Sequence, residues 1–229
     1  MNWRDKLKEL HKYSRLFDFE YLLDVEYNAL NSFLIESEDT INKKEQEIES
    51  KIEAWKIERK SYDDVPEPFE MFENEIIEFN QFSPLLNNPF FIMAYSIFER
   101  YLFEICAYCR SEENVQQTVN DISSKSYIDQ CRKYIEKVIN VNLSAIQPEW
   151  QEIKKYQNIR NSIAHNNGIL KKNVAKQKNL IDYLKANQYV KYYESERIVS
   201  LESIKFISDF TGVVTNYISK LMNEIRNQK

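Results

Sequence analysis

The chain is poor in glycine, with only two in 229 residues, against an average usage of about 7 %. Tight hairpin turns and phosphate-cradling loops need backbone positions with positive φ, which glycine adopts at the lowest cost. The isolated glycines at positions 168 and 212 cannot form a glycine-rich nucleotide-binding loop. The scarcity of glycine excludes that class of site and favours a chain built from long helices.

Long apolar runs and a disulfide framework are also missing. No stretch approaches the roughly 18 consecutive apolar residues of a membrane span, and the charged N-terminal segment lacks the apolar core of a signal peptide. Three cysteines are an odd number and predict no disulfide framework. Hydrophobic residues make up 43 % of the chain, which is enough to bury a core. We therefore expect a cytoplasmic protein in a reducing compartment, with no membrane partner.

The sequence offers few ligands to a metal ion. Cys106 and Cys109 are spaced as a CxxC pair, but zinc needs two further ligands at suitable spacing. Cys131 and the two histidines of the chain do not supply a recognisable second pair. We therefore expect no metal and no cofactor, and we interpret the cysteine pair as small apolar residues of a buried helix.

The net charge of −5 conceals an uneven distribution. Residues 1–80 carry 11 basic and 21 acidic side chains, whereas residues 81–229 carry 20 basic and 15 acidic ones. An acidic part joined to a basic part often indicates two roles within one chain. The overall charge therefore does not exclude a nucleic-acid partner for the basic part.

Apolar residues recur at helical spacing over most of the chain, which predicts an all-α fold. We expect an acidic N-terminal extension over residues 1–84, as a long helix or a helical hairpin, followed by a helical domain over residues 85–229. Residues 41–60 are mostly charged and carry only a thin apolar seam. This pattern is typical of a solvated helical arm, with a partner-binding helix as the alternative.

Asparagine and proline predict where the central helix begins. Asn88 as N-cap with Pro89 in the first turn is a strong helix start. The apolar run that follows, to about residue 110, is expected to form the central buried helix. Shorter helices are expected at residues 112–121 and 126–140.

The last third of the chain is punctuated by one proline and one glycine. Pro148 predicts the start of a helix, and Gly168 predicts its end in a C′ position. Residues 189–201 are rich in β-branched and aromatic residues and fit a small β-hairpin, although no Asn-Gly or Asp-Gly turn supports it. Residues 201–226 predict a final amphipathic helix.

His165 has the most informative surroundings of the two histidines, because His11 has no supporting cluster. On a helix, Arg160 projects from within the apolar stripe that its isoleucine neighbours form. Arginine is rarely placed there unless it pairs with another group or binds an anion. Asn161 and His165 are four residues apart and are neighbours on the flank of this stripe. These three side chains are candidates to line a cleft, where the helix C-terminus favours the protonated imidazole.

The pattern Arg160-Asn161-x-x-x-His165 near a helix end, followed by a turn, resembles the Arg-x(4–6)-His signature of HEPN domains. These are all-helical domains of prokaryotic toxins, abortive-infection proteins and other RNA-directed defence effectors. The preceding apolar helix is similar to the HEPN core helix, in which an acidic residue often faces the motif, and Glu99 stands at that place here. The resemblance covers residues 85–229 and leaves the N-terminal extension unexplained.

The resemblance implies a metal-independent endoribonuclease that cleaves RNA by attack of a ribose 2′-OH and leaves a 2′,3′-cyclic phosphate, as a toxin or anti-phage defence effector. His165 would be the general acid or base, and Arg160 would grip the phosphate. Asn161 would orient His165 or donate to the phosphate, and Glu99 would hold the arginine. Because one histidine per chain cannot be both acid and base, the resemblance also implies a homodimer with two facing motifs.

One departure from the family pattern concerns regulation. Some HEPN domains carry a tyrosine two residues after the histidine, where a nucleotidyltransferase partner modifies it. This chain has Asn167 at that position, so we expect no regulation of that kind.

Basic residues surround the motif in the sequence. Lys154, Lys155, Lys171 and Lys172 belong to a basic segment in which Glu152 is the only acidic residue. Such a segment attracts a phosphate backbone, and we expect these four lysines to bind RNA. A lysine-rich loop that only solubilises the protein is the alternative interpretation.

The competing hypothesis for the whole chain is a catalytically inactive helical interaction module. Degenerate domains of this kind serve as scaffolds, and the acidic N-terminal arm would then bind a protein partner. A toxin would also be expected to have an antitoxin or another regulatory protein partner.

Overall fold

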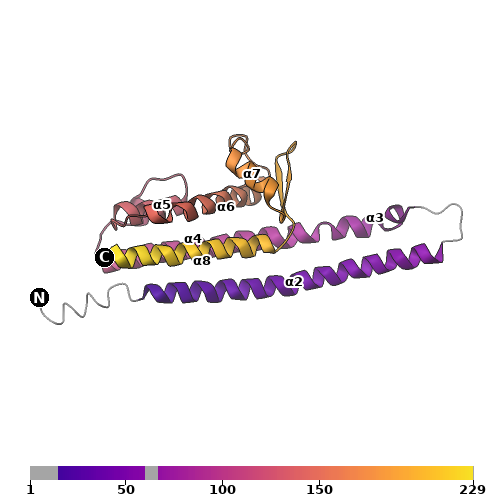
Figure 1. Cartoon of the computed structure of the whole chain (residues 1–229), viewed down its shortest axis with the longest axis horizontal. Helices are drawn as coiled ribbons and strands as arrows, with labels where there is room; N and C mark the ends of the chain where they lie inside the picture. The colour runs from indigo at the N-terminus through magenta and orange to yellow at the C-terminus, as the bar shows by residue number, and fades with distance from the viewer. Residues whose placement is uncertain (1–14, 60–66, 229) are drawn as a thin grey trace, which may run out of the picture.

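The computed structural model describes residues 15–59 and 67–228, which form an all-α fold with one small β-hairpin (Figure 1). In chain order the elements are α2 (Leu16–Glu58), α3 (Pro68–Phe79), α4 (Phe82–Glu112), a 3₁₀ turn (Val119–Asp121), α5 (Tyr127–Lys137), a second 3₁₀ turn (Ser144–Ile146), α6 (Gln147–Asn166), α7 (Lys178–Ala186), β1 (Val190–Tyr193), β2 (Ile198–Leu201) and α8 (Lys205–Gln228). The predicted all-α class is confirmed. Within the described ranges, no helix is both long and apolar enough to cross a membrane.

Long helices run side by side in the body of the molecule, which we define as α4, α5, α6, α8 and the first half of α2. Helix α2 contacts α4 and α8, and α6 packs on α4 and α8 from the other side (Figure 1). Phe91 of α4 lies at their junction, with its ring centroid 6.3 Å from Tyr156 of α6 and 5.1 and 5.4 Å from Phe206 and Phe210 of α8. Buried rings of this size dominate the packing energy of a core.

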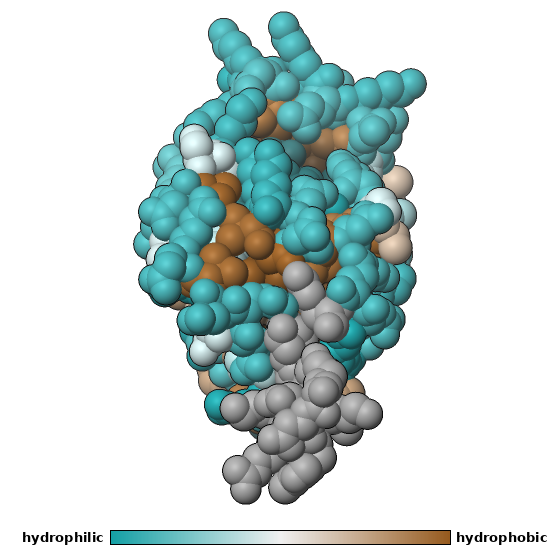
Figure 2. All heavy atoms as spheres, turned by 90° about the vertical axis from the view of Figure 1, so that its left-hand side faces the viewer, coloured by the Kyte–Doolittle hydropathy of each residue, from teal (hydrophilic) through white to brown (hydrophobic). Residues whose placement is uncertain are grey.

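Apolar spacing explains why α8 packs in the middle of the body. Fully buried side chains recur along it three or four residues apart and therefore form a row on one side of the helix, among them Phe206, Phe210, Val214, Tyr217 and Leu221. Figure 2, which views the body from the end opposite α3, shows hydrophobic side chains gathered between hydrophilic ones. The core therefore reaches this end of the molecule, enclosed by polar side chains.

Helix α4 begins earlier than the sequence predicts. It starts at Phe82 and runs through Asn88 and Pro89, so the predicted helix start at these two residues is wrong. A proline inside a helix removes one backbone hydrogen bond. Packing offsets that cost here, because the neighbouring Asn87 is buried and its side-chain amide donates to the Leu201 carbonyl at 2.9 Å.

The two helices predicted between residues 112 and 140 also need correction. Helix α4 continues to Glu112, and the segment after it contains only a 3₁₀ turn, which Thr118 and Asp121 close with a capping box. Helix α5 is shorter than expected and is followed by Asn140 in the left-handed conformation, with φ 61°. Side-chain hydrogen bonds thus compete with the helix in this segment.

Helix α2 is continuous and belongs to two parts of the molecule. In its first half Leu23 is buried in the body, and the Tyr27 hydroxyl donates to the Ala94 carbonyl of α4 at 3.1 Å. Its second half, residues 41–58, pairs with α3, and the two form a helical hairpin that we call the arm (Figure 1). The predicted division after residue 84 falls in the first turn of α4, and the hydrophobic core of the body extends across it.

The predicted β-hairpin is confirmed, and it follows a helix that the sequence did not indicate. Strands β1 and β2 are antiparallel, with Val190 opposite Leu201. Arg197 takes a positive φ of 61° in the turn, where glycine or asparagine is usual, so the expected turn dipeptide is not needed. Helix α7 escaped prediction because only Leu180 and Leu184 of it are buried, among lysine and amide side chains.

Candidate active site

The end of α6 carries the motif and is tied to the β-hairpin. Asn167 and Gly168 have φ values of 50° and 81°, which confirms the predicted helix end with Gly168 in the C′ position. The Gly168 N–H donates to the Ser162 carbonyl at 2.9 Å, and its own carbonyl accepts from the Val199 N–H at 3.0 Å. A Cβ on residue 168 would lie 2.7 Å from the Val199 carbonyl oxygen. Only glycine fits at position 168. Its hydrogen bond with Val199 therefore holds the turn that follows His165 against the β-hairpin.

Arg160 lies at the centre of the candidate site. Its Nη1 atom is 3.3 Å from Asn161 Oδ1 and 3.4 Å from His165 Nε2. Its Nη2 atom is 3.6 Å from Glu99 Oε2 on α4. The structure thus brings together all four residues that the motif and its resemblance single out.

The Arg160 side chain is held in place rather than solvated. It is only 20 % exposed, and its Cζ atom lies 5.4 Å from the centre of the Tyr95 ring. Its Nε atom is buried and has no hydrogen-bond partner among the described residues. Tyr95 is a site residue that the sequence analysis missed; it precedes Glu99 by four residues on α4, so the signal was helical spacing.

Glu99 faces Arg160 from a partly buried position, with 23 % of its side chain exposed. Burial raises the pKa of the Glu99 carboxyl above its ordinary value, and the Arg160 guanidinium opposes this effect. The contact with Glu99 therefore holds the Arg160 side chain in place. It costs free energy, because the Glu99 carboxylate is partly removed from water. Perturbed carboxyls beside a cation are frequent in functional sites.

His165 is exposed at the edge of this cluster. Because arginine has only hydrogen-bond donors, a bond between Arg160 Nη1 and His165 Nε2 requires Nε2 to accept, with the imidazole proton on Nδ1. An imidazole that accepts at Nε2 and carries its proton on Nδ1 is the form that acts as a general base.

The four lysines expected to bind RNA differ in their surroundings. Lys154 pairs with Asp129 of α5 at 2.8 Å, and Lys155 pairs with Glu152 at 2.7 Å. The local charge count missed the first of these acids because it comes from another helix. The other two lysines are exposed in the segment between α6 and α7: Lys171 and Lys172.

The cysteines pack inside the body. Cys106, Cys109 and Cys131 are buried and form no disulfide, and the Cys106 thiol donates to the Cys131 carbonyl at 3.6 Å. Burial raises the pKa of the Cys106 thiol, which keeps it protonated. Their interpretation as apolar packing residues is confirmed. Among the described residues no three histidine, cysteine or acidic side chains are grouped to hold a metal, and His11 lies outside those residues.

Comparisons with protein-family models, curated proteins and solved structures give no match to this chain. A function therefore has to be inferred from the geometry of the site, in which one arginine on α6 contacts a glutamate on α4, an asparagine and a histidine.

Proposed function

We propose that this chain is a metal-independent endoribonuclease of the HEPN type, which cleaves RNA in the cytoplasm as a toxin or anti-phage defence effector. The observation that carries the proposal is the shared guanidinium of Arg160, which contacts Glu99 on one side and both Asn161 and His165 on the other. An arginine that served only a structural ion pair would not need a histidine and an asparagine beside it, at 3.4 and 3.3 Å from its Nη1 atom.

The residues of the site suit attack by a ribose 2′-OH on the adjacent phosphate. His165 in its neutral form accepts the hydroxyl proton, and this leaves an alkoxide to attack phosphorus. The Arg160 fork binds the non-bridging phosphate oxygens and stabilises the charge that develops on them. Glu99 and Tyr95 keep the guanidinium in position. Because the guanidinium supplies positive charge at the phosphate oxygens, the reaction requires no metal ion.

A second copy of the chain would supply the acid that protonates the leaving 5′-oxygen. An exposed stripe of α4 beside Glu99 has the 4-3-4-3 spacing of a helix–helix seam: Pro89, Met93, Ser96, Arg100 and Phe103. Phe103 is 36 % exposed and stacks on Tyr127 of α5, with ring centroids 5.8 Å apart. We assign this stripe to a two-fold homodimer in which the two Arg160–His165 pairs face one cleft.

The direct test is cleavage of a labelled single-stranded RNA by the purified full-length protein in the presence of a metal chelator. We expect products with 2′,3′-cyclic phosphate ends, identified by mass spectrometry. His165→Ala and Arg160→Ala should each lower the rate by about 10²- to 10³-fold.

Arg59→Ala is the matched control, because Arg59 is an exposed arginine on the arm. It should cleave at the wild-type rate. Equal activity of the wild type, His165→Ala and Arg160→Ala, or no cleavage by any of them, would contradict the proposal.

A second candidate function is a protein-interaction module, and the surface of the arm favours it. Ile57 is 67 % exposed and Phe69 is 53 % exposed, and α3 carries four glutamates with no basic residue. An antitoxin or regulatory protein with a basic, partly apolar face would fit this surface. If Ile57→Ser with Phe69→Ser abolishes the effect of expression on cell growth while His165→Ala leaves it intact, the interaction module is the better description.

A further inference from the structure

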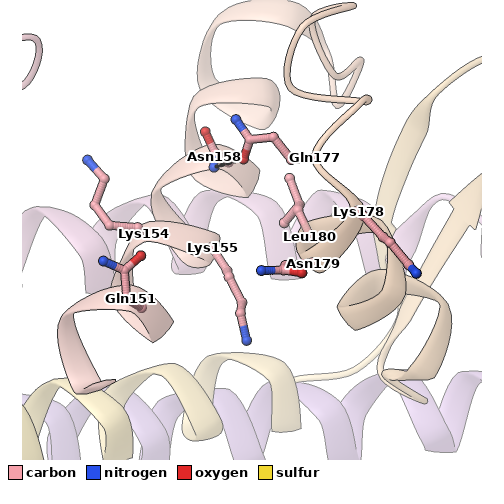
Figure 3. Close-up of a pocket in the computed structure, with 8 residues that line it drawn as sticks. All are labelled: Gln151, Lys154, Lys155, Asn158, Gln177, Lys178, Asn179 and Leu180. Carbon is pink, nitrogen blue, oxygen red and sulfur yellow. Dashed lines mark hydrogen bonds between the residues drawn. The ribbon is translucent and has the colours of Figure 1, made fainter. Parts of the chain in front are cut away.

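A polar hollow of about 410 Å³ lies between α6 and the start of α7 (Figure 3). Its lysines come from both helices, Lys154 and Lys155 from α6 and Lys178 from α7. The other lining side chains are amides and one leucine, so none of them is acidic. A concave surface that offers only cations and amides suits an anion.

Hydrogen-bond donors line this hollow from α6 and from the start of α7, and the ammonium groups of Lys154 and Lys178 point outward from its rim (Figure 3). Gln151 and Asn158 line it from α6, and Asn179 lines it from α7 with its amide directed toward the Lys155 side chain (Figure 3). Lys178 and Asn179 also begin α7, so their backbone N–H groups have no carbonyl within the helix to bond, whereas the N–H groups of Leu180 and Ile181 donate to the Gln177 carbonyl. Amides, ammonium groups and a helix N-terminus together match the several oxygens of a phosphate.

A neighbouring hollow differs from this one in having acidic side chains in its lining. The second hollow shares Gln151 with the first and has a volume of about 390 Å³, but Asp129 and Glu136 line it. Two of the lining lysines pair with acids outside the lining: Lys155 with Glu152 of the same helix, at side-chain exposures of 28 % and 34 %, and Lys154 with Asp129 of α5. An i,i+3 ion pair on a helix contributes about 0.2–0.5 kcal/mol, so a phosphate can replace the pair of Lys155 with Glu152 at little cost.

Helical spacing connects the hollow to the candidate active site. Asn158, Asn161 and His165 are separated by three and four residues and therefore lie along one flank of α6. From Asn158 to His165 the helix rises by about 10 Å, which is the length of about three stacked nucleotides of one strand.

From this placement we infer that the hollow binds a backbone phosphate of the RNA strand about three nucleotides from the bond that is cut. This inference rests on the proposed ribonuclease function and adds a subsite to it. Lys155 supplies the charge within the hollow, and Lys178 adds to it from the rim. Gln151 and Asn179 supply neutral donors, and Asn158 supplies the amide N–H that its 3.4 Å hydrogen bond to Gln177 Oε1 does not use. Lys154 contributes less, because Asp129 occupies its ammonium group at 2.8 Å.

The test measures binding without cleavage, with full-length protein that carries His165→Ala and a 5′-fluorescein single-stranded RNA of 12 nucleotides. Adding Lys155→Gln and Lys178→Gln should weaken binding by about tenfold and lower the slope of log K against log salt by about 0.7 for each phosphate that the protein no longer neutralises. The matched control is Lys43→Gln with Lys56→Gln, which removes the same charge from two exposed lysines on α2. The control should bind within about twofold of the His165→Ala parent, and thermal melting should show that both double variants are folded.

The outcomes separate this inference from the proposed function. In the chain with His165 intact, Lys155→Gln with Lys178→Gln should raise KM about tenfold and leave kcat unchanged. Equal weakening by the two double variants, or no binding of the RNA, would overturn the inference even if the wild type cleaves RNA. Binding that depends on the hollow, with no cleavage by the wild type, would support the RNA subsite and overturn the ribonuclease.

Discussion

The body and the arm are both built from long helices, yet different forces hold them together. In the body, Phe210 is completely buried among other rings. In the arm, α2 and α3 meet through the exposed ion pair of Lys51 with Glu75 and the edge-to-face contact of Trp55 with Phe72 at 6.3 Å. Buried apolar area contributes about 25 cal/mol per Å², whereas an exposed ion pair contributes about 0–1 kcal/mol. The body is therefore held together mainly by buried apolar contacts, whereas the contacts of the arm are more exposed.

The candidate site depends on that difference. Arg160 on α6 and Glu99 on α4 come from helices whose spacing is set by the shared contacts of Phe91, Tyr156 and Phe210. A catalytic group must keep its position within about 0.5 Å, which a dense aromatic core provides and a charged helical pair does not. Variants in the two regions test this contrast.

Removing a core ring should cost more than removing a buried side chain of the arm. Phe210→Ala should lower the free energy of unfolding by about 3–5 kcal/mol, because Phe210 contacts rings on both α4 and α6. Ile48→Ala, at the most buried position of the arm, should cost about 2 kcal/mol or less. Urea unfolding monitored by circular dichroism measures both, and equal losses would show that the arm is as tightly packed as the body.

The two glycines form a natural pair of sites with opposite expected effects. Gly168→Ala should destabilise the protein by about 1–3 kcal/mol, because φ is +81° and the new Cβ would meet the Val199 carbonyl oxygen at 2.7 Å. Gly212→Ala should stabilise it by about 0.5–1 kcal/mol, because nothing lies within 4 Å of that Cβ on the exposed side of α8. Thermal melting compares the two variants. A Gly168→Ala protein as stable as the wild type would contradict the role of Gly168 in holding the turn after α6.

The partly buried carboxyl of Glu99 should make stability depend on pH. Burial raises its pKa in the folded state, so the folded protein binds this proton more tightly than the unfolded chain does. The contribution of Glu99 to the free energy of unfolding is therefore complete at low pH, and it is lost as pH rises through the folded-state pKa. Unfolding of the wild type and Glu99→Gln, compared between about pH 4 and pH 7, should show the wild type losing stability relative to the variant as pH rises. The opposite trend would mean that the ion pair with Arg160 outweighs burial.

The ion pair of the arm should contribute the least. A double-mutant cycle of Lys51→Ala and Glu75→Ala should give a coupling free energy of about 0.5 kcal/mol or less, because the two side chains are 49 % and 44 % exposed. The coupling should decrease further in high salt. A value above about 1 kcal/mol would show that electrostatics holds the arm together.

Much of the fold was predictable from local patterns. The buried faces of α6 and α8, the end of α6 at Gly168 and the β-hairpin all follow from apolar spacing and from backbone preferences that act within a few residues. The errors occur where distant contacts override those preferences. Asn88 and Pro89 look like a helix start, but α4 passes through them because Asn87 is bound to Leu201, which lies more than 100 residues away in the chain.

The candidate site divides in the same way. The grouping of Arg160, Asn161 and His165 follows from their spacing on one helix, and the partnership of Arg160 with Glu99 agrees with what the family resemblance implies. Sequence reasoning missed Tyr95 under the guanidinium and Asp129 beside Lys154, because both come from other helices. Spacing and charge counts within the segment that contains the motif leave out residues of neighbouring helices.

The amino-acid sequence alone determined that this protein is helical, that its charge is divided between an acidic and a basic part, and that one helix end carries an arginine, an asparagine and a histidine. These properties depend on composition and on spacing of three or four residues. The tertiary structure added that α2 contributes to both body and arm, that Glu99 and Tyr95 of α4 hold the arginine, and that the hollow beside α7 has no acidic side chain in its lining. Those properties depend on which helices pack together, because desolvation and pairing act between side chains that are distant in the sequence.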